Sequence, residues 1–98
     1  MPNRNYQAGV RFERARKKVW EQDGNVVLRT AGSHGPFDLV AIGEDRVRLI
    51  QCKRVQTKAQ AMRLIRLFEA KPPLFCSGAT QYLEVYVKDL REVQVGVV

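Results

Sequence analysis

The sequence contains few of the residues that build closed metal sites or disulfide frameworks. Its 98 residues include two cysteines, Cys52 and Cys76, and one histidine, His34. A structural zinc site needs about four such ligands, so one chain of this composition is not expected to form one. Each cysteine has apolar neighbours, which favours two free buried thiols over a disulfide in a reducing compartment. A catalytic Cys–His pair is disfavoured, because Cys52 lies within a strand-like run and Cys76 follows a Pro-Pro pair.

Long apolar segments are also missing. No apolar run approaches the roughly 18 residues of a membrane helix, and residues 1–10 lack the apolar core of a secretion signal. We therefore expect a cytoplasmic protein without a membrane partner, in the nucleoid or, for a viral protein, in the host cytoplasm. The length of 98 residues predicts a single domain, 1–98, with one modest core.

Acidic side chains are scarce relative to basic ones. The chain has 17 Lys and Arg against 10 Asp and Glu, a net charge of +7. Residues 1–66 hold 14 basic and 6 acidic side chains, a net +8, whereas residues 67–98 hold 3 and 4, a net −1. Such a surface attracts polyanions, and nucleic acid is the commonest of them. A merely soluble basic surface is the alternative.

Hydrophobic periodicity predicts an α/β fold. Residues 7–22 have helical spacing and end at Gly24, and their apolar stripe consists of Ala8, Phe12, Ala15 and Val19. A second helix opens at a capping box, 57–60, and runs to about Ala70; its stripe consists of Ala61, Leu64, Ile65 and Phe68. Short alternating runs predict strands over 25–30, 37–42, 47–55, 82–87 and 93–98. The order α-β-β-β-α-β-β predicts a mixed β-sheet of about five strands flanked by helices.

The turn between the second and third predicted strands fixes their register. Centring it between Glu44 and Asp45 pairs residues whose numbers sum to 89. The pairs that share one face are then Ile42–Val47, Val40–Leu49 and Asp38–Gln51. Two of these pairs are apolar, so we expect this face to be buried and to end in a polar rim.

Asp38, Gln51 and Lys53 converge at that rim, because side chains alternate along a strand and Lys53 follows Gln51 on the same face. The register alone leaves three interpretations open. The three side chains form a solvated strand end, a structural Asp–Lys pair, or a metal site with an adjacent cation.

Three stretches of the sequence, taken together, narrow this choice. They are Gly9 to Arg14 (G-x-x-x-E-R), Arg29 to Ala41 (R-x-x-G-S-x-G-x-x-D-L-V-A), and Asp38 followed by Gln51-Cys52-Lys53. The last motif occurs often by chance, but the set is specific and covers residues 9–54 in order. The set resembles the archaeal-type Holliday junction resolvases, which have the restriction-endonuclease-like fold and the PD-(D/E)xK signature.

The resemblance implies a role for each matched residue. Glu13, Asp38 and Gln51 would supply oxygen ligands to Mg²⁺ (or Mn²⁺), together with the backbone carbonyl of Cys52. Lys53 would lie beside the attacking water and the scissile phosphate and stabilise developing negative charge. The family usually has Glu where this chain has Gln51, so the site loses one unit of negative charge. The candidate catalytic residues are Glu13, Asp38, Gln51 and Lys53.

By the same resemblance, Ser33 contacts the phosphate backbone, and Arg14 and Arg29 approach DNA. His34 is a proton shuttle, a phosphate contact or an ordinary surface residue of the glycine-rich loop. The expected DNA-binding residues are Arg11, Arg14, Arg29, Ser33, His34, Arg54 and Lys58.

The implied function is metal-dependent, structure-specific cleavage of branched DNA. The resemblance predicts a homodimer that resolves four-way (Holliday) junctions by paired phosphodiester hydrolysis, with no small-molecule substrate. The near-neutral C-terminal third, 67–98, is expected to supply the dimer contact. One alternative is a nuclease of the same fold that acts on nicked, flap or mismatched DNA. The other is a basic DNA-binding module without catalysis.

Overall fold

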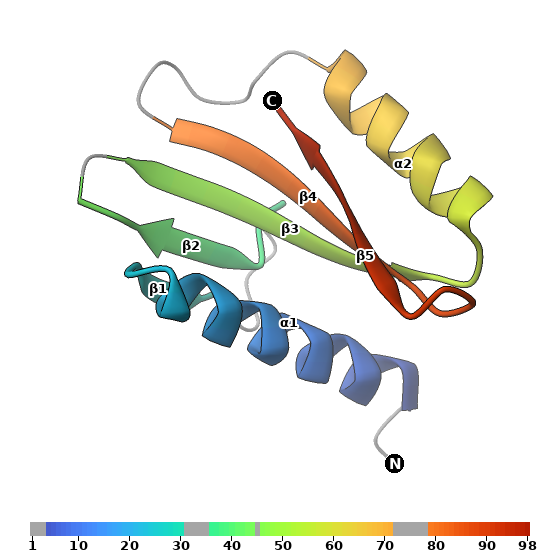
Figure 1. The fold of residues 1–98 in the computed structure, drawn as a ribbon, viewed down its shortest axis with the longest axis horizontal. Coiled ribbons are helices and arrows are strands. Elements are labelled where there is room, and N and C mark those ends of the chain that lie inside the picture. Colours follow the sequence, from blue (N-terminus) through green and yellow to red (C-terminus); the bar gives the residue numbers. More distant parts are fainter. Residues whose placement is uncertain (1–3, 31–35, 45, 72–78) are drawn as a thin grey trace.

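Two helices and five strands form the structure, a computed structural model that describes residues 4–30, 36–44, 46–71 and 79–98 (Figure 1). The elements are α1 (Arg4–Gln22), β1 (Val26–Arg29), β2 (Leu39–Ile42), β3 (Val47–Val55), α2 (Lys58–Ala70), β4 (Ala79–Val87) and β5 (Glu92–Val97). The element order confirms the prediction, and so does the capping box of α2, in which Thr57 and Gln60 bond reciprocally. Neither helix is long and apolar enough, within the described ranges, to cross a membrane.

The strands form one mixed sheet in the order β1-β2-β3-β4-β5. β3 and β4 are parallel and the other neighbours are antiparallel. The parallel pair needs a crossover connection, and α2 lies within it. α1 packs on one face of the sheet and α2 packs on the other face (Figure 1).

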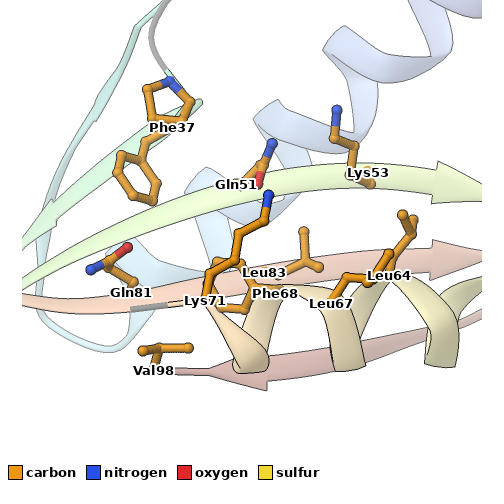
Figure 2. A pocket seen from close by; sticks show the side chains of 11 residues that line it. Phe37, Gln51, Lys53, Leu64, Leu67, Phe68, Lys71, Gln81, Leu83 and Val98 are labelled. Carbon is orange, nitrogen blue, oxygen red and sulfur yellow. The ribbon is translucent and has the colours of Figure 1, made fainter. Parts of the chain in front are cut away.

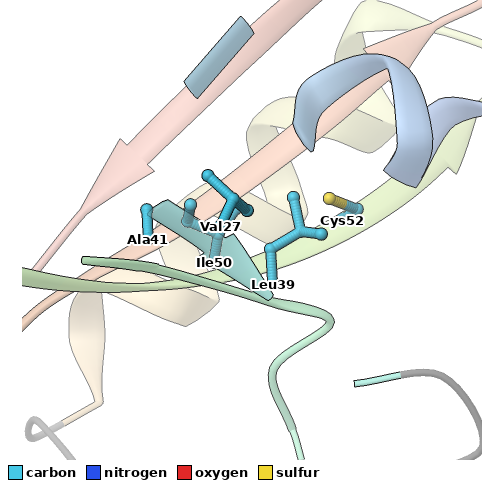
Figure 3. Close-up of a cluster of buried hydrophobic side chains, with 5 residues drawn as sticks. All are labelled: Val27, Leu39, Ala41, Ile50 and Cys52. Carbon is cyan, nitrogen blue, oxygen red and sulfur yellow. The ribbon is translucent and has the colours of Figure 1, made fainter. Parts of the chain in front are cut away.

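Each helix buries its own cluster of apolar side chains. On the α1 face, Phe12 and Trp20 pack against a buried cluster of Val27, Leu39, Ala41, Ile50 and Cys52 (Figure 3). On the α2 face, the buried cluster consists of Ala61, Ile65, Leu83, Val85 and Val87. Leu64 and Phe68 pack against this second cluster, so the predicted stripe of α2 is confirmed.

The predicted stripe of α1 is partly wrong. Ala15 is exposed and Val19 is 41% exposed, whereas Phe12, Arg16 and Trp20 point toward the sheet. The face of α1 that packs on the sheet is rotated by about one residue, because Arg16 and Trp20 donate hydrogen bonds to the buried carboxylate of Glu84 on β4. Helical spacing among small apolar residues gave no indication of that partner.

The register of the β2–β3 hairpin is confirmed, but its buried face is the opposite one. Val40 pairs with Leu49 and Ile42 with Val47, as predicted. These residues are half-buried or exposed, with Ile42 at 42% exposure. Their neighbours Leu39, Ala41 and Ile50 are fully buried instead, because α1 covers that face of β1 to β3. Helix α2 lies further along the sheet, against β4 and β5.

Candidate active site

Asp38 directly precedes β2 and is fixed by three hydrogen bonds. Its backbone N–H donates to the carbonyl of Ile50 at 2.9 Å, and its own carbonyl accepts from the N–H of Thr30 at 2.9 Å. Its carboxylate oxygen Oδ2 accepts from the backbone N–H of Cys52 at 2.8 Å. The side chain of Asp38 thus continues the ladder where β2 stops pairing and β3 runs on.

The backbone of Cys52 places an oxygen at the same point. The N–H and C=O of one strand residue point to the same edge of the strand. Because the Cys52 N–H points to Asp38, the Cys52 carbonyl also points to the edge of β3 that β2 no longer covers. A carboxylate and a carbonyl lie together there, and both are hard oxygen donors that suit Mg²⁺.

Gln51 and Lys53 leave β3 on the α2 face, as the strand alternation requires. Both line a cavity of about 360 Å³ between the sheet and α2 (Figure 2). Gln51 is half-buried and Lys53 is exposed. An amide and an ammonium group are therefore presented at a largely apolar surface.

Glu13 approaches β3 from the opposite face, on α1. It lines a second cavity, of about 440 Å³, together with Cys52, Lys53 and Arg54. Its oxygen Oε1 accepts a hydrogen bond from Nε of Arg29 at 2.9 Å, so the expected metal ligand is paired with an expected DNA-binding residue. Lys53 borders both cavities and links the two halves of the predicted site.

The groups around β3 that could bind a divalent cation are oxygen donors, but few of them are carboxylates. The described ranges contain no group of three His, Cys, Asp or Glu side chains placed to hold a metal. A metal at this edge would use the free carboxylate oxygen of Asp38, the Cys52 carbonyl and the Gln51 amide, and Glu13 once Arg29 releases it. All of these groups are oxygen donors.

The thiol of Cys52 takes no part in this chemistry. Burial raises the pKa of Cys52 well above its usual range, and the negative charges of Glu84, Asp38 and Glu13 raise it further, against a small opposing effect of Arg16. The thiol stays protonated and packs in the core.

One buried acidic group was missed by the sequence reasoning. Glu84 on β4 is 1% exposed and lies next to Cys52 in the sheet. Arg16 donates to its two oxygens at 2.9 and 3.0 Å, and Trp20 Nε1 donates to both at 3.3 and 3.2 Å. The hydrogen bond to Glu84 raises the pKa of Arg16, so the guanidinium stays charged. The available signal was a glutamate inside the apolar run of residues 82–87.

The expected DNA-binding residues divide into three groups. Arg11, Arg14 and Lys58 are exposed. Arg54 lies over the ring of Tyr86 at 5.5 Å, while Arg29 is held by Glu13. The remaining two, Ser33 and His34, lie outside the described residues.

Residues 4–66, which include Glu13, Asp38, Gln51 and Lys53, match the archaeal Holliday junction resolvase (Hjc) family. The chain belongs to this family. The assignment confirms the resemblance found in the sequence motifs.

The crossover junction endodeoxyribonuclease Hjc of Methanocaldococcus jannaschii is 42% identical over 48 residues, which cover 49% of this chain. That match spans 35% of the relative, about a third of its length. The structure of Archaeoglobus fulgidus Hjc, a Holliday junction resolvase, superposes with a TM-score of 0.61 over 91% of this chain and 71% of that one. At 21% identity, this second similarity supports the mixed five-stranded α/β fold.

Proposed function

We propose that this chain is a metal-dependent endonuclease that resolves four-way DNA junctions by phosphodiester hydrolysis. The observation that carries the proposal is the position of Asp38. Its carboxylate is fixed on the Cys52 N–H, at the part of the β3 edge that β2 does not pair with among the described residues. Gln51 and Lys53 flank that edge. Membership of the Hjc family and the basic surface of residues 1–66 support branched DNA as the substrate.

Each site residue has a distinct part in the proposed hydrolysis. Asp38, Gln51 and the Cys52 carbonyl would hold Mg²⁺ or Mn²⁺, which when bound supplies Lewis acidity and a more acidic water. Lys53 is exposed and would stabilise the charge that develops on the scissile phosphate. Glu13 would join the ligand set after separating from Arg29.

A homodimer with paired cuts is part of the proposal. β5 is an edge strand, and its Val95 and Val97 are each 45% exposed. They pair with Glu84 and Tyr82 and so face away from α2, which packs against Gly96. No described strand pairs with the outer edge of β5, and such an edge beside exposed valines suits a contact with a second copy.

A non-catalytic junction-binding module is the second candidate, and two observations favour it. Gln51 brings no charge to the ligand set, and Arg29 neutralises Glu13. Such a module would bind branched DNA with strong salt dependence and cut nothing.

The deciding experiment is incubation of the chain with an end-labelled four-way junction, with and without Mg²⁺ or Mn²⁺. Linear, nicked and flap DNA of matched sequence serve as controls. We expect paired incisions in opposite strands of the junction, in the presence of metal. Salt-sensitive binding without incision in either metal would favour the second candidate, and preferential cutting of nicked or flap DNA would point to a different nuclease of this fold.

A further inference from the structure

Gly9 is a glycine inside helix α1 that the packing of the described residues does not require. Its backbone is that of an ordinary helical residue, without a positive φ. Glycine is less favourable than alanine at such a position, because it has more backbone freedom to lose on folding. A Cβ atom built on Gly9 would meet no described atom within 4 Å, so the helix has room for a side chain there. The glycine of the G-x-x-x-E-R motif therefore needs a reason outside this packing.

The space beside Gly9 belongs to the cavity on the α1 side of the candidate active site. That cavity has a volume of about 440 Å³, and Gly9 and Glu13 line it from α1, while Cys52 and Lys53 line it from β3. Gly9 precedes Glu13 by four residues, so the two lie on the same face of the helix. A side chain at Gly9 would thus stand next to the expected metal ligand.

Cations dominate the rim of this cavity. Lys53, Arg54 and Lys88 line it, and Glu13 supplies the carboxylate. The charge of Glu13 is compensated by Arg29, whose Nε lies 2.9 Å from its Oε1. Lys88 is exposed and forms no ion pair with a described residue. The cavity therefore favours an anionic chain over a neutral ligand.

Lys88 lies further along the sheet than Lys53. The parallel register pairs Lys53 with Val85, so Lys88 follows three residues, or about 10 Å, beyond that point. The turn that carries Lys88 is anchored to the end of β3, because the N–H of Asp89 donates to the carbonyl of Gln56 at 3.0 Å. The side-chain amide of Gln56 in turn donates to the carboxylate of Asp89. The two lysines are thus placed to contact different phosphates of one strand.

We propose that the sugar-phosphate backbone of the cleaved DNA strand crosses α1 at Gly9, with Lys88 on a phosphate next to the scissile one. The proposal rests on the proposed function and adds two positioning residues to it. The missing side chain of Gly9 leaves room for the strand beside Glu13, and close approach of a backbone to a ligand is one use of glycine. Lys53 and Lys88 together would hold the strand in register with Asp38.

Substitution of Gly9 tests the strand path, because stability and function should change in opposite directions. Alanine and leucine favour helix, so Gly9→Ala and Gly9→Leu should each raise the melting temperature by about 3–6 °C. Ca²⁺ replaces Mg²⁺ so that the junction is bound without being cut. Gly9→Ala should raise the Kd about threefold and Gly9→Leu about tenfold or more, because each side chain obstructs the strand.

Ala15→Gly is the matched control for stability, because Ala15 is exposed on the same helix and does not line the cavity. It should lower the melting temperature by a similar amount, about 3–6 °C, and leave the Kd unchanged at a temperature where the variant is folded.

Neutral methylphosphonates at single positions of the cleaved strand test the contact of Lys88. At one position next to the scissile phosphate, the loss of charge should weaken binding by the wild type about fivefold. The same junction should bind to Lys88→Gln with a Kd changed by less than about twofold, because the contact is already absent. Lys88→Gln should also reduce the slope of log K against log salt by about 0.9. Lys18→Gln, an exposed lysine of α1 away from the cavity, should keep the wild-type response.

Separate outcomes address the strand path and the proposed function. If the wild type binds no junction, the proposed function fails. If the wild type binds and cuts, but Gly9→Leu binds equally tightly or every methylphosphonate affects Lys88→Gln and wild type alike, the strand path alone is overturned. A melting temperature of Gly9→Ala below that of the wild type would overturn it as well, because the fold itself would then need the glycine.

Discussion

Arg29 donates a hydrogen bond from Nε to Oε1 of Glu13 at 2.9 Å. The side chain of Arg29 is 18% exposed and that of Glu13 is 20% exposed. The pair joins the end of β1 to α1, and both residues belong to family motifs in the sequence. A divalent cation that takes Glu13 as a ligand competes with this guanidinium. We propose that metal binding at Glu13 would release Arg29 toward DNA.

Arg29→Gln tests this competition. Removing the guanidinium frees Glu13, and a partly exposed ion pair contributes up to about 1 kcal/mol, so Mn²⁺ should bind about two- to fivefold more tightly. Isothermal titration in the absence of DNA measures the affinity directly. Lys17→Gln breaks an exposed ion pair with Glu21 on the same helix and should leave the affinity unchanged. Equal Mn²⁺ affinity in Arg29→Gln and wild type would show that Glu13 is not a ligand.

Asp38→Asn should abolish cleavage while preserving the fold. The amide oxygen can still accept the Cys52 N–H, so the free energy of unfolding should change by less than about 1 kcal/mol. Junction binding should stay equal or tighten, because a negative charge near phosphate is removed. Asp38→Ala also loses the hydrogen bond and should cost about 1–2 kcal/mol more stability. Near wild-type cutting by Asp38→Asn in Mg²⁺ would refute the assigned role.

Gln51→Glu should lower the Mg²⁺ concentration for half-maximal cleavage. The substitution keeps the shape and adds a charge close to the ion, with a gain that partial solvation reduces. Gln51→Ala should need more metal or prefer Mn²⁺, because one oxygen donor is lost. Titration of Mg²⁺ at saturating junction separates metal binding from DNA binding. If neither variant shifts the midpoint, Gln51 is no ligand, and weaker junction binding by Gln51→Glu would indicate a DNA contact.

Glu84→Gln should destabilise the fold through Arg16. Removing one partner of a buried pair leaves the other charge uncompensated and costs about 3 kcal/mol, toward the lower end because the Arg16 side chain is 20% exposed. Replacing both residues, with Arg16→Met and Glu84→Leu together, should recover most of this loss. Urea denaturation gives the free energies. Glu21→Gln, in an exposed pair, should cost less than about 0.5 kcal/mol; a similarly small loss in Glu84→Gln would contradict the prediction.

Charge on β5 should disrupt the proposed dimer. The wild type is expected to scatter light at twice its chain mass of 11.2 kDa. Val95→Lys combined with Val97→Lys places two like charges at a self-complementary contact and should shift the mass to that of one chain. Val26→Lys is the control at the opposite edge of the sheet, since Val26 is 65% exposed on β1. A wild-type monomer that makes paired symmetric cuts would exclude the dimer.

The sequence by itself determined the elements and the hairpin register. Two features depend on hydrogen bonds between residues close in the chain: the capping box of Thr57 and Gln60, and the turn after Ile42. Both can therefore be predicted from short stretches of sequence. Strand alternation then placed Gln51 and Lys53 on one face and Cys52 on the other. The motif residues of the Hjc family lie within these same locally determined elements.

The tertiary structure alone decided which face of the hairpin is buried and which charges pair. Burial of Leu39 and Ile50 rather than Val40 and Leu49 depends on where α1 packs, and an alternating strand is consistent with either face. The Arg16–Glu84 pair joins residues 68 positions apart, and no local pattern ranks such partners. The cavity that Gln51 and Lys53 line likewise exists only because α2 returns over β3 and β4. Packing between distant segments, rather than local hydrogen bonding, sets these features.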